Sequence, residues 1–527
     1  MSRVTDAVDA IDAPDGLPPE GMVVSSHPLA VEAGLEALRA GGTAVDAAVA
    51  AAAVLGVVDP MSTSLGGDVF ALVWDQDAKA LHGYNGSGRA PAAATLEDLR
   101  RRGHATLPER GWLPVTVPGA VDAFDALLAR FGRRDLGQAL APAIRAAKDG
   151  FAATPVVARD WAAAAPLLEQ RGLSDFLPVP KAGQHVTLPA LAGTLEALAA
   201  GGRDAFYRGA FAERLGAASE AAGGWLRAED LAAHAGEWVA PLEGAYRGHP
   251  VYELPPNGQG LIVLQALAML EEYPLADLPE DERTHLQIEA LKLAFADAAA
   301  HLGDPAHTDA ARLLDPAYLE ERCDLLDAFR EKANTAPATG LPRAGGDTVY
   351  VAAMDPAGNA CSLIHSTYMH FGAGVAVDGV VLQNRGALFS ADPHHPSALG
   401  PGRRPYHTII PAMVFRSDHP WLVFGVVGGY QQPQAQVQLL VRLIDLGESL
   451  QDALDAPRFR WLQGATLKLE EGVDPALRAK LEARGHRLAG ADAHGGFGGA
   501  QAILVGEEGL VGASDPRKDG KVGRWRP

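Results

Sequence analysis

A predicted hairpin brings two hydroxyl side chains together directly after a linker. Residues 348–354 and 360–366 are β-branched or apolar runs, and the five residues Asp-Pro-Ala-Gly-Asn between them have the composition of a tight turn. If the turn is centred on Ala357, Thr348 lies opposite Ser366, close enough for their hydroxyls to hydrogen-bond. A threonine hydroxyl is a poor nucleophile unless a base lies within hydrogen-bond reach. Taken alone, such a pair is more often an ordinary contact in a sheet.

The second candidate for chemistry is the glycine pair Gly428-Gly429. It follows a predicted strand over residues 421–427 and precedes a predicted helix over residues 434–446. Two glycine amides at such a turn can both point at one oxygen, and the helix dipole helps to stabilise negative charge there. The alternative is a tight turn in which glycine supplies only backbone freedom.

A glycine turn and a group of histidines are weaker candidates for ligand binding. The turn Ser64-Leu65-Gly66-Gly67 lacks both the GK[ST] ending and the GxGxxG spacing of phosphate-binding loops, so we interpret it as structural. Histidines five apart on one strand face opposite sides, and the chain contains no HExxH sequence. The sequence therefore predicts neither a cofactor nor a metal site. The histidines of this group are His365, His370, His394, His395 and His407.

Composition narrows the classes of partner. The chain has 527 residues, of which 48% are hydrophobic, and its formal net charge is −20. That charge disfavours nucleic acid or an anionic membrane as the main partner. Two cysteines, Cys323 and Cys361, support neither a disulfide framework nor a cysteine metal site. We expect a globular protein with ample material for a core, and the composition leaves a homo-oligomer open.

No targeting or membrane segment is expected. The first 22 residues are acidic and rich in Ala, Asp and Pro, without the basic and apolar regions of a signal peptide. The apolar stretch 44–58 is interrupted by Asp46 and is too short to span a bilayer, so it predicts a buried helix. The sequence therefore favours a cytoplasmic protein with a loose N-terminal tail over residues 1–22.

The order of the predicted elements suggests layers. Helical patterns dominate between about residues 95 and 345, whereas strand patterns dominate after the linker at 331–346. The hairpin strands are apolar on both faces and must be covered on both sides. Predicted helices cover residues 29–39, 44–55, 120–131, 139–149, 261–270, 284–302 and 434–446; predicted strands cover 23–26, 69–74, 348–354, 360–366, 375–382, 408–415, 421–427 and 500–505.

Several segments together resemble the gamma-glutamyltranspeptidase family. The hairpin region carries Asp347-Thr348-Val349-Tyr350, Asp355–Asn359, Ser366 and Phe371-Gly372. The similarity extends over nearly the whole sequence beyond residue 22. The further matching blocks are 23–60, Val117-Pro118-Gly119, Pro255-Pro256-Asn257-Gly258, 294–305 and Asp515-Pro516-Arg517.

The resemblance implies a fold and a maturation step. The implied fold is an α+β, four-layer αββα sandwich of the N-terminal nucleophile hydrolase type. In this family the precursor is cut before a threonine, here between Asp347 and Thr348. The large segment 23–347 and the small segment 348–527 would then stay associated as one interleaved domain.

The resemblance also implies catalytic roles. The new α-amine of Thr348 would act as general base for its own hydroxyl, since a terminal amine with a pKa of about 7.7–8.0 is partly unprotonated near neutrality. Ser366 matches the second hydroxyl that orients the nucleophile. Gly428 and Gly429 match the oxyanion hole.

The residues that recognise the substrate depart from the family pattern. Ser87 stands where the family has the arginine that holds a substrate carboxylate, and Arg89 lies nearby but displaced. The groups that hold a substrate amine are replaced by Arg385 and Leu388, which favours a small anionic amide over an amino-acid head group. Tyr368 replaces an asparagine, and His407-Thr408 replaces a serine pair. The expected substrate-binding residues are Arg385, Arg89, His407, Thr408 and Tyr368.

This pattern resembles the branch of oxamate amidohydrolases and cephalosporin-acylase-like proteins more than the glutathione-cleaving members. The sequence therefore predicts a self-processing threonine amidohydrolase or acyltransferase that acts on an amide of a small acid. Two alternatives remain open: a gamma-glutamyl hydrolase or transferase acting on glutathione-like substrates, and a non-catalytic binding protein with the same fold.

Overall fold

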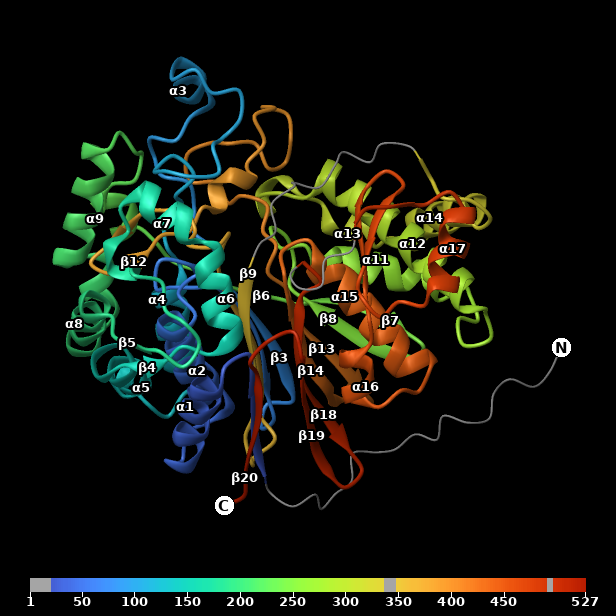
Figure 1. Ribbon diagram of the computed structural model, residues 1–527, viewed down its shortest axis with the longest axis horizontal. Coiled ribbons are helices and arrows are strands. Elements are labelled where there is room, and N and C mark those ends of the chain that lie inside the picture. Colours follow the sequence, from blue (N-terminus) through green and yellow to red (C-terminus); the bar gives the residue numbers. More distant parts are fainter. Residues whose placement is uncertain (1–19, 336–346, 491–495) are drawn as a thin grey trace.

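Two antiparallel β-sheets packed face to face form the centre of the protein (Figure 1). The computed structural model describes residues 20–335, 347–490 and 496–527. The seven-stranded sheet has the order β20 (Lys521–Trp525), β1 (Gly21–Ser25), β9 (Asp347–Met354), β10 (Ala360–Tyr368), β2 (Asp68–Asp75), β3 (Ala80–Asn85), β6 (Glu237–Val239). The six-stranded sheet has the order β19 (Gly509–Ser514), β18 (Gly499–Gly506), β14 (His419–Val427), β13 (Pro411–Arg416), β8 (His249–Glu253), β7 (Leu242–Tyr246).

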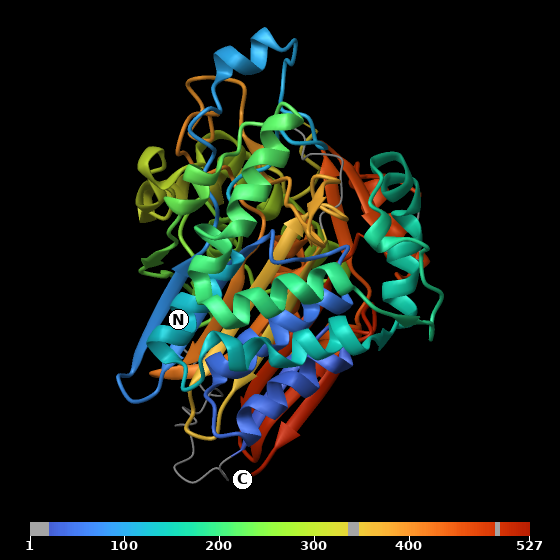
Figure 2. The ribbon, with the colours of Figure 1, turned by 90° about the vertical axis from the view of Figure 1, so that its left-hand side faces the viewer.

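A layer of helices covers the outer face of each sheet, which completes the predicted four-layer αββα sandwich (Figures 1 and 2). The layer on the seven-stranded sheet contains α1 (Pro28–Arg39), α2 (Ala44–Val58), α4 (Ala120–Phe131), α5 (Leu136–Asp149), α6 (Pro155–Ala163), α7 (Ala165–Arg171), α8 (Pro189–Tyr207) and α9 (Ala210–Ala221). The layer on the six-stranded sheet contains α11 (Gly260–Leu270), α12 (Glu280–His301), α13 (Ala310–Leu313), α14 (Pro316–Ala328), α15 (Gln431–Leu440), α16 (Leu450–Asp455) and α17 (Pro475–Ala483).

The remaining elements are short. They are α3 (Leu96–Arg101), α10 (Ala228–Ala232), β4 (Phe151–Ala152), β5 (His185–Val186), β11 (Ala376–Val377), β12 (Val380–Val381), β15 (Phe459–Gln463), β16 (Thr466–Leu469) and β17 (Arg487–Leu488). Among the helices of the described residues, none is both long enough and apolar enough to cross a bilayer.

Each central strand is buried on both faces, as the apolar runs predicted. In β2, Val69, Ala71 and Val73 pack toward the helices, whereas Phe70, Leu72 and Trp74 pack toward the other sheet. Every residue of α2 is buried, which confirms the prediction that this apolar segment is a buried helix. It lies directly against β9 and β10.

Strands from before and after Thr348 share the seven-stranded sheet. β9 is bonded on one edge to β1 and on the other to β10, and β10 pairs in turn with β2. The expected pairing in the hairpin holds from Met354↔Ala360 to Val349↔His365, after which a bulge shifts the register. The β9–β10 hairpin thus lies between strands of the preceding segment.

Several predicted boundaries differ from the structure. β1 begins at Gly21, so Gly21 and Met22 belong to the sheet and not to the tail. The strand expected over 375–382 is instead the pair of two-residue strands β11 and β12, and the strand expected to start at residue 408 starts at Pro411. The helix expected over 434–446 starts at Gln431, and its final turn at 441–445 is a π-helix. Long-range pairing and helix packing set these boundaries.

The close approach of the two sheets at Gly425 gives a testable prediction. A Cβ atom on Gly425 in β14 would lie 2.3 Å from the ring of Tyr350 in β9. Because Tyr350 is fully buried, Gly425→Ala should lower the free energy of unfolding by about 1–3 kcal/mol, the usual cost of overpacking. Thermal unfolding measures the effect. In the control Gly193→Ala, in α8, the added Cβ has no neighbour within 4 Å, and the variant should be as stable as the parent or more so. Equal midpoints for Gly425→Ala and the parent would contradict this packing.

Candidate active site

The two hydroxyls expected to be paired are in contact. Thr348, the second residue of β9, is 1% exposed, and its Oγ1 donates a hydrogen bond to Ser366 Oγ at 3.2 Å. The backbone N–H of Tyr368 donates to the same serine oxygen at 2.8 Å. The bulge in β10 turns Tyr368 to a positive φ of 79° and brings its N–H back to Ser366. Ser366 therefore holds a fixed position beside Thr348.

The glycine pair lies at the start of α15. Gly428 and Gly429 have φ angles of 121° and 61°, which explains why glycine is required at both positions. Their carbonyl oxygens accept hydrogen bonds from the backbone of Gln431 and Gln432. The turn thus joins the end of β14 to the positive end of a helix dipole, the arrangement expected of an oxyanion hole.

Buried glutamines fix this helix in place. Gln434 and Gln438 each donate to and accept from the backbone of β15, at Trp461 and Phe459. Such side chains satisfy backbone groups at the sheet edge that would otherwise be buried and unpaired. The glycine turn therefore leads into a helix that is anchored by hydrogen bonds on both sides of two side chains.

Gln259 links the glycine turn to the predicted substrate residues. Its Nε2 donates to the carbonyl oxygens of Thr408 at 2.7 Å and Gly429 at 3.0 Å. Tyr406 Oη donates to Gln259 Oε1 at 2.9 Å. Sequence reasoning missed Gln259, although it directly follows the family block Pro255–Gly258.

Arg385 is a fully buried cation with unused donors. Its Nη1 donates to Thr408 Oγ1 at 2.8 Å, and its guanidinium lies over the ring of Tyr368 at 4.7 Å. Nε and Nη2 have no hydrogen-bond partner among the described residues. Burial lowers the pKa of Arg385 to about 10, so the side chain remains charged at neutral pH. A buried charge with open donors is costly unless a ligand pairs with it.

Asp68 and His407 form a buried pair beside the hydroxyls. Asp68 in β2 is the cross-strand neighbour of Ser366, and His407 Nε2 lies 3.1 Å from its Oδ2. His407 Nδ1 accepts from the backbone N–H of Ile409, so Nε2 carries the proton and donates to Asp68. Burial raises the pKa of Asp68 to about 7, and burial with nearby arginines lowers the pKa of His407 well below its usual value.

Asp68 also ties several loops together. Its Oδ1 accepts from the backbone N–H groups of Gly88 and Gly119 and from Gln383 Nε2, at 3.1, 3.2 and 3.2 Å. Sequence reasoning treated the turn before Asp68 as structural and missed this residue. The available signal was an acidic residue that opens a strand otherwise apolar and buried.

Arg89 makes no hydrogen bond to Asp68, His407, Arg385 or Thr408 among the contacts of the described residues. Its half-exposed guanidinium pairs with Glu237 and donates to the carbonyl of Gly402 at 3.0 Å. The arginine that reaches the loop at Ser87 is Arg404, which is 1% exposed and donates from Nε to the Ser87 carbonyl at 3.1 Å. The expectation that Arg89 contributes to substrate binding is therefore not supported by its contacts.

The histidines singled out in the sequence do not gather. His365 bonds to the carbonyl of Ser64, His395 bonds to that of Ala299, and His394 is exposed. Across the described ranges, the cluster with metal-ligand chemistry is His285, Glu289 and His486. There Lys292 Nζ lies 2.6 Å from Glu289, and the two histidines bond directly to each other at 2.8 Å. The lysine thus pairs with the glutamate and the histidines pair with each other, whereas His486 Nδ1 has no hydrogen-bond partner among the described residues.

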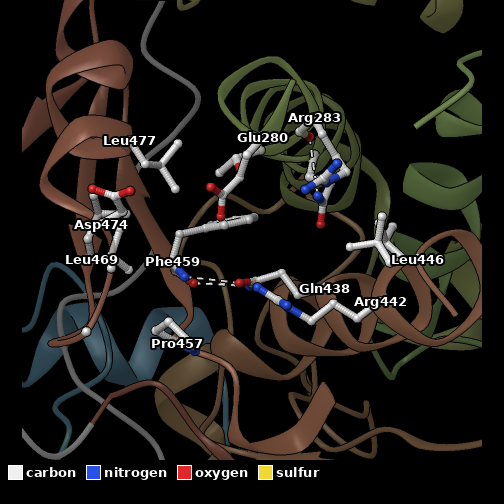
Figure 3. A pocket seen from close by; sticks show the side chains of 15 residues that line it. Glu280, Arg283, Gln438, Arg442, Leu446, Pro457, Phe459, Leu469, Asp474 and Leu477 are labelled. Carbon is white, nitrogen blue, oxygen red and sulfur yellow. Dashed lines mark hydrogen bonds between the residues drawn. The ribbon is translucent and has the colours of Figure 1, made fainter. Parts of the chain in front are cut away.

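A pocket of about 230 Å³ opens in the helix layer on the six-stranded sheet (Figure 3). Arg283 of α12, Gln438 of α15 and Phe459 of β15 contribute to its lining. None of the hydroxyl, glycine or buried arginine candidates lines it. It is a feature separate from the candidate active site.

Comparison with known proteins agrees with the motifs. The sequence model of gamma-glutamyltranspeptidase matches residues 30–525. A glutathione hydrolase-like proenzyme of Bacillus subtilis is 39% identical over 525 residues, covering 95% of this chain and 97% of that protein. The oxamate amidohydrolase proenzyme of Klebsiella pneumoniae is 39% identical over 528 residues, with the same coverage. The crystal structure of a cephalosporin acylase from Bacillus halodurans superposes with a TM-score of 0.91 at 39% identity, over 100% of both chains. The chain is an enzyme of the gamma-glutamyltranspeptidase family, with the N-terminal nucleophile hydrolase fold of its amidohydrolases and acylases.

Proposed function

We propose that the enzyme cuts its own chain between Asp347 and Thr348. It then hydrolyses an amide of a small anionic acid, such as oxamate or a similar compound, through an intermediate in which the acyl group is bound to Thr348. The observation that carries this proposal is Arg385, which is fully buried, keeps two unused donors and lies over Tyr368 next to the hydroxyl pair. The proenzymes among its relatives support processing into two associated segments.

The self-cleavage step follows from which groups can accept a proton before and after the cut. In the intact chain the nitrogen of Thr348 is an amide and cannot take a proton, so the hydroxyl lacks its base. Attack of Thr348 Oγ1 on the carbonyl of Asp347 gives an ester and breaks the peptide bond, and water then hydrolyses the ester. The freed α-amine, with a reference pKa of about 7.7–8.0, can accept the hydroxyl proton in later turnovers.

Each turnover would use the same groups. Thr348 Oγ1 attacks the amide carbonyl while its proton passes to the α-amine, and the N–H groups of Gly428 and Gly429 stabilise the oxyanion. The proton then goes to the leaving amine, and water attacks the acyl ester. Ser366 keeps the nucleophile oriented through the 3.2 Å hydrogen bond.

The substrate class is proposed from the charges. A guanidinium can bind a carboxylate through two parallel hydrogen bonds, and Arg385 has two donors available for this. The amine-binding acid of the gamma-glutamyl enzymes is replaced by Leu388. A small acid amide therefore fits better than a gamma-glutamyl group, and comparing rates on oxamate and a gamma-glutamyl anilide separates the two.

The first prediction concerns maturation. The purified parent should give two bands on a denaturing gel, corresponding to the segments before and after Thr348, because the hydroxyl attacks the preceding carbonyl. Thr348→Ala should give a single band, whereas Thr348→Ser keeps a hydroxyl and should still be cut. Two bands from Thr348→Ala would rule out this route, and an uncut parent would favour the non-catalytic alternative.

The second prediction concerns orientation of the nucleophile. Ser366→Ala removes the acceptor of both Thr348 Oγ1 and the Tyr368 N–H, so turnover should fall about 10²-fold, as expected for a misplaced reacting group. The control is Ser362→Ala on the same strand. Ser362 Oγ bonds to Tyr350 Oη of the neighbouring strand β9 at 2.7 Å. That variant should lose stability but retain kcat. Similar kcat values for both variants would remove the special role of Ser366.

The third prediction concerns substrate binding. Arg385→Lys keeps the charge but loses the planar fork, so KM for oxamate should rise about ten- to a hundredfold, the effect of one lost hydrogen bond to a charged group. Self-cleavage at Thr348 should remain. The matched control is Arg89→Lys, because Arg89 is already paired with Glu237 on the surface, and its KM should stay at the parent value. An unchanged KM in Arg385→Lys would show that this arginine does not anchor the carboxylate.

A further inference from the structure

The candidate site contains one buried cation and one buried anion that do not touch. Arg385 and Asp68 are both 0% exposed. Two adjacent residues connect them: Thr408 Oγ1 accepts from Arg385 Nη1 at 2.8 Å, and His407 Nε2 donates to Asp68 Oδ2 at 3.1 Å. With His407 neutral, the positive and negative charges of this group balance in the empty site. Such balance matters because an isolated buried charge is costly.

The groups that face the Asp68 carboxylate come from separate segments. Among them are three cationic or titratable side chains, namely His407 in direct contact and Arg385 and Arg404 acting at longer range. The others are uncharged donors: the N–H groups of Gly88 and Gly119, and Gln383 Nε2. Ser366 is its neighbour across the β2–β10 ladder. Asp68 is therefore held by donors on both oxygens, with Arg385 as a counter-charge that it does not contact directly.

We propose that Asp68 is the internal counter-ion of Arg385, and that the Asp68–His407 pair takes up one proton when a substrate carboxylate binds to that arginine. The inference rests on the proposed function, since it requires Arg385 to bind the carboxylate. In the empty site the charges of Arg385 and Asp68 cancel. A bound carboxylate adds one negative charge, and a proton from solvent restores neutrality. Asp68 thereby determines how strongly anionic amides are preferred at a given pH.

The direction of the effect follows from the charges. Burial raises the pKa of Asp68 to about 7, and the charge of Arg385 is the largest influence that lowers it. A substrate carboxylate offsets that charge, so the pKa of the Asp68–His407 pair rises further when the anion is bound. The bound state then holds more protons than the free state, and anion binding weakens as the pH rises above about 7. The proton is assigned to the pair because the 3.1 Å hydrogen bond joins the two side chains.

The test compares oxamate with oxamide, its neutral isostere, from about pH 6 to pH 9. In the processed parent, the ratio of kcat/KM for oxamate over oxamide should fall by up to about tenfold per pH unit between the pKa of the free pair and its higher pKa with the anion bound, the slope of one linked proton. Titration of the Thr348 α-amine affects both substrates equally and cancels in the ratio. The measured slope therefore reports only on groups that distinguish a carboxylate from an amide.

Two variants assign the proton. Asp68→Asn keeps the shape but cannot titrate, so its ratio should be independent of pH. The matched control is Asp122→Asn, which replaces a buried carboxylate of α4 that is bonded to Tyr84 and Arg203 and should keep the slope of the parent. A sloping ratio in Asp68→Asn would overturn the assignment.

A binding measurement on the parent decides the point even if Asp68→Asn fails to fold. Oxalate binding is measured calorimetrically in phosphate and in Tris, whose ionisation enthalpies differ, slightly above neutral pH. The difference between the two apparent enthalpies should correspond to uptake of about one proton. Oxalate binding without proton uptake, or a preference for oxamate that does not vary with pH, overturns this inference and leaves the proposed function intact. Equal handling of oxamate and oxamide at every pH, together with no oxalate binding, overturns the proposed function as well.

Discussion

The pairing of β9 on both edges is the constraint on which the rest of the site depends. β9 begins at the proposed cleavage point, and its backbone bonds to β1 on one side and β10 on the other. A cut before Thr348 would free a chain end without releasing the strand that carries it. The same ladder sets Thr348 beside Ser366 and, one strand further, Ser366 beside Asp68. A loop could not hold a new terminus at that precision, whereas a strand in the middle of a packed sheet can.

The glycine turn and the recognition loops depend on the second sheet. β14 delivers Gly428 and Gly429 to the start of α15, and Gln259 ties that turn to Thr408. Arg385 reaches the same threonine from a short helical turn after β12. The glycine turn and the proposed substrate-binding residues are therefore joined by hydrogen bonds through Gln259 and Thr408. The hydrogen bond to Thr408 therefore holds Arg385 in position, although its Nε and Nη2 have no partner among the described residues.

The local sequence pattern was sufficient to predict the structure where the contacts are between residues close together in the chain. The hairpin register could be predicted because the turn at 355–359 fixes it, and the glycine turn could be predicted because a strand and a helix flank it. The ion pair of Arg89 could not be predicted because adjacency in sequence does not give side-chain direction, and its partner Glu237 lies on a distant strand. Asp68 and Gln259 were missed because their partners come from loops far along the chain. The tail boundary was wrong because β1 is defined by strands near the middle and end of the sequence.

The division between strands and loops explains how the family can change substrate without changing its chemistry. Thr348 and Ser366 lie on strands whose register is fixed by packing on both faces, so substituting them would disturb the core. The proposed recognition residues Tyr368, Arg385 and Thr408 lie at or beyond strand ends, where a new side chain would leave the register of the strands unchanged. Asp68 belongs to both groups, because its backbone opens a core strand while its carboxylate holds the loops. A change of charge at Arg385 must therefore be matched at Asp68, since both side chains are fully buried and an unbalanced buried charge is destabilising.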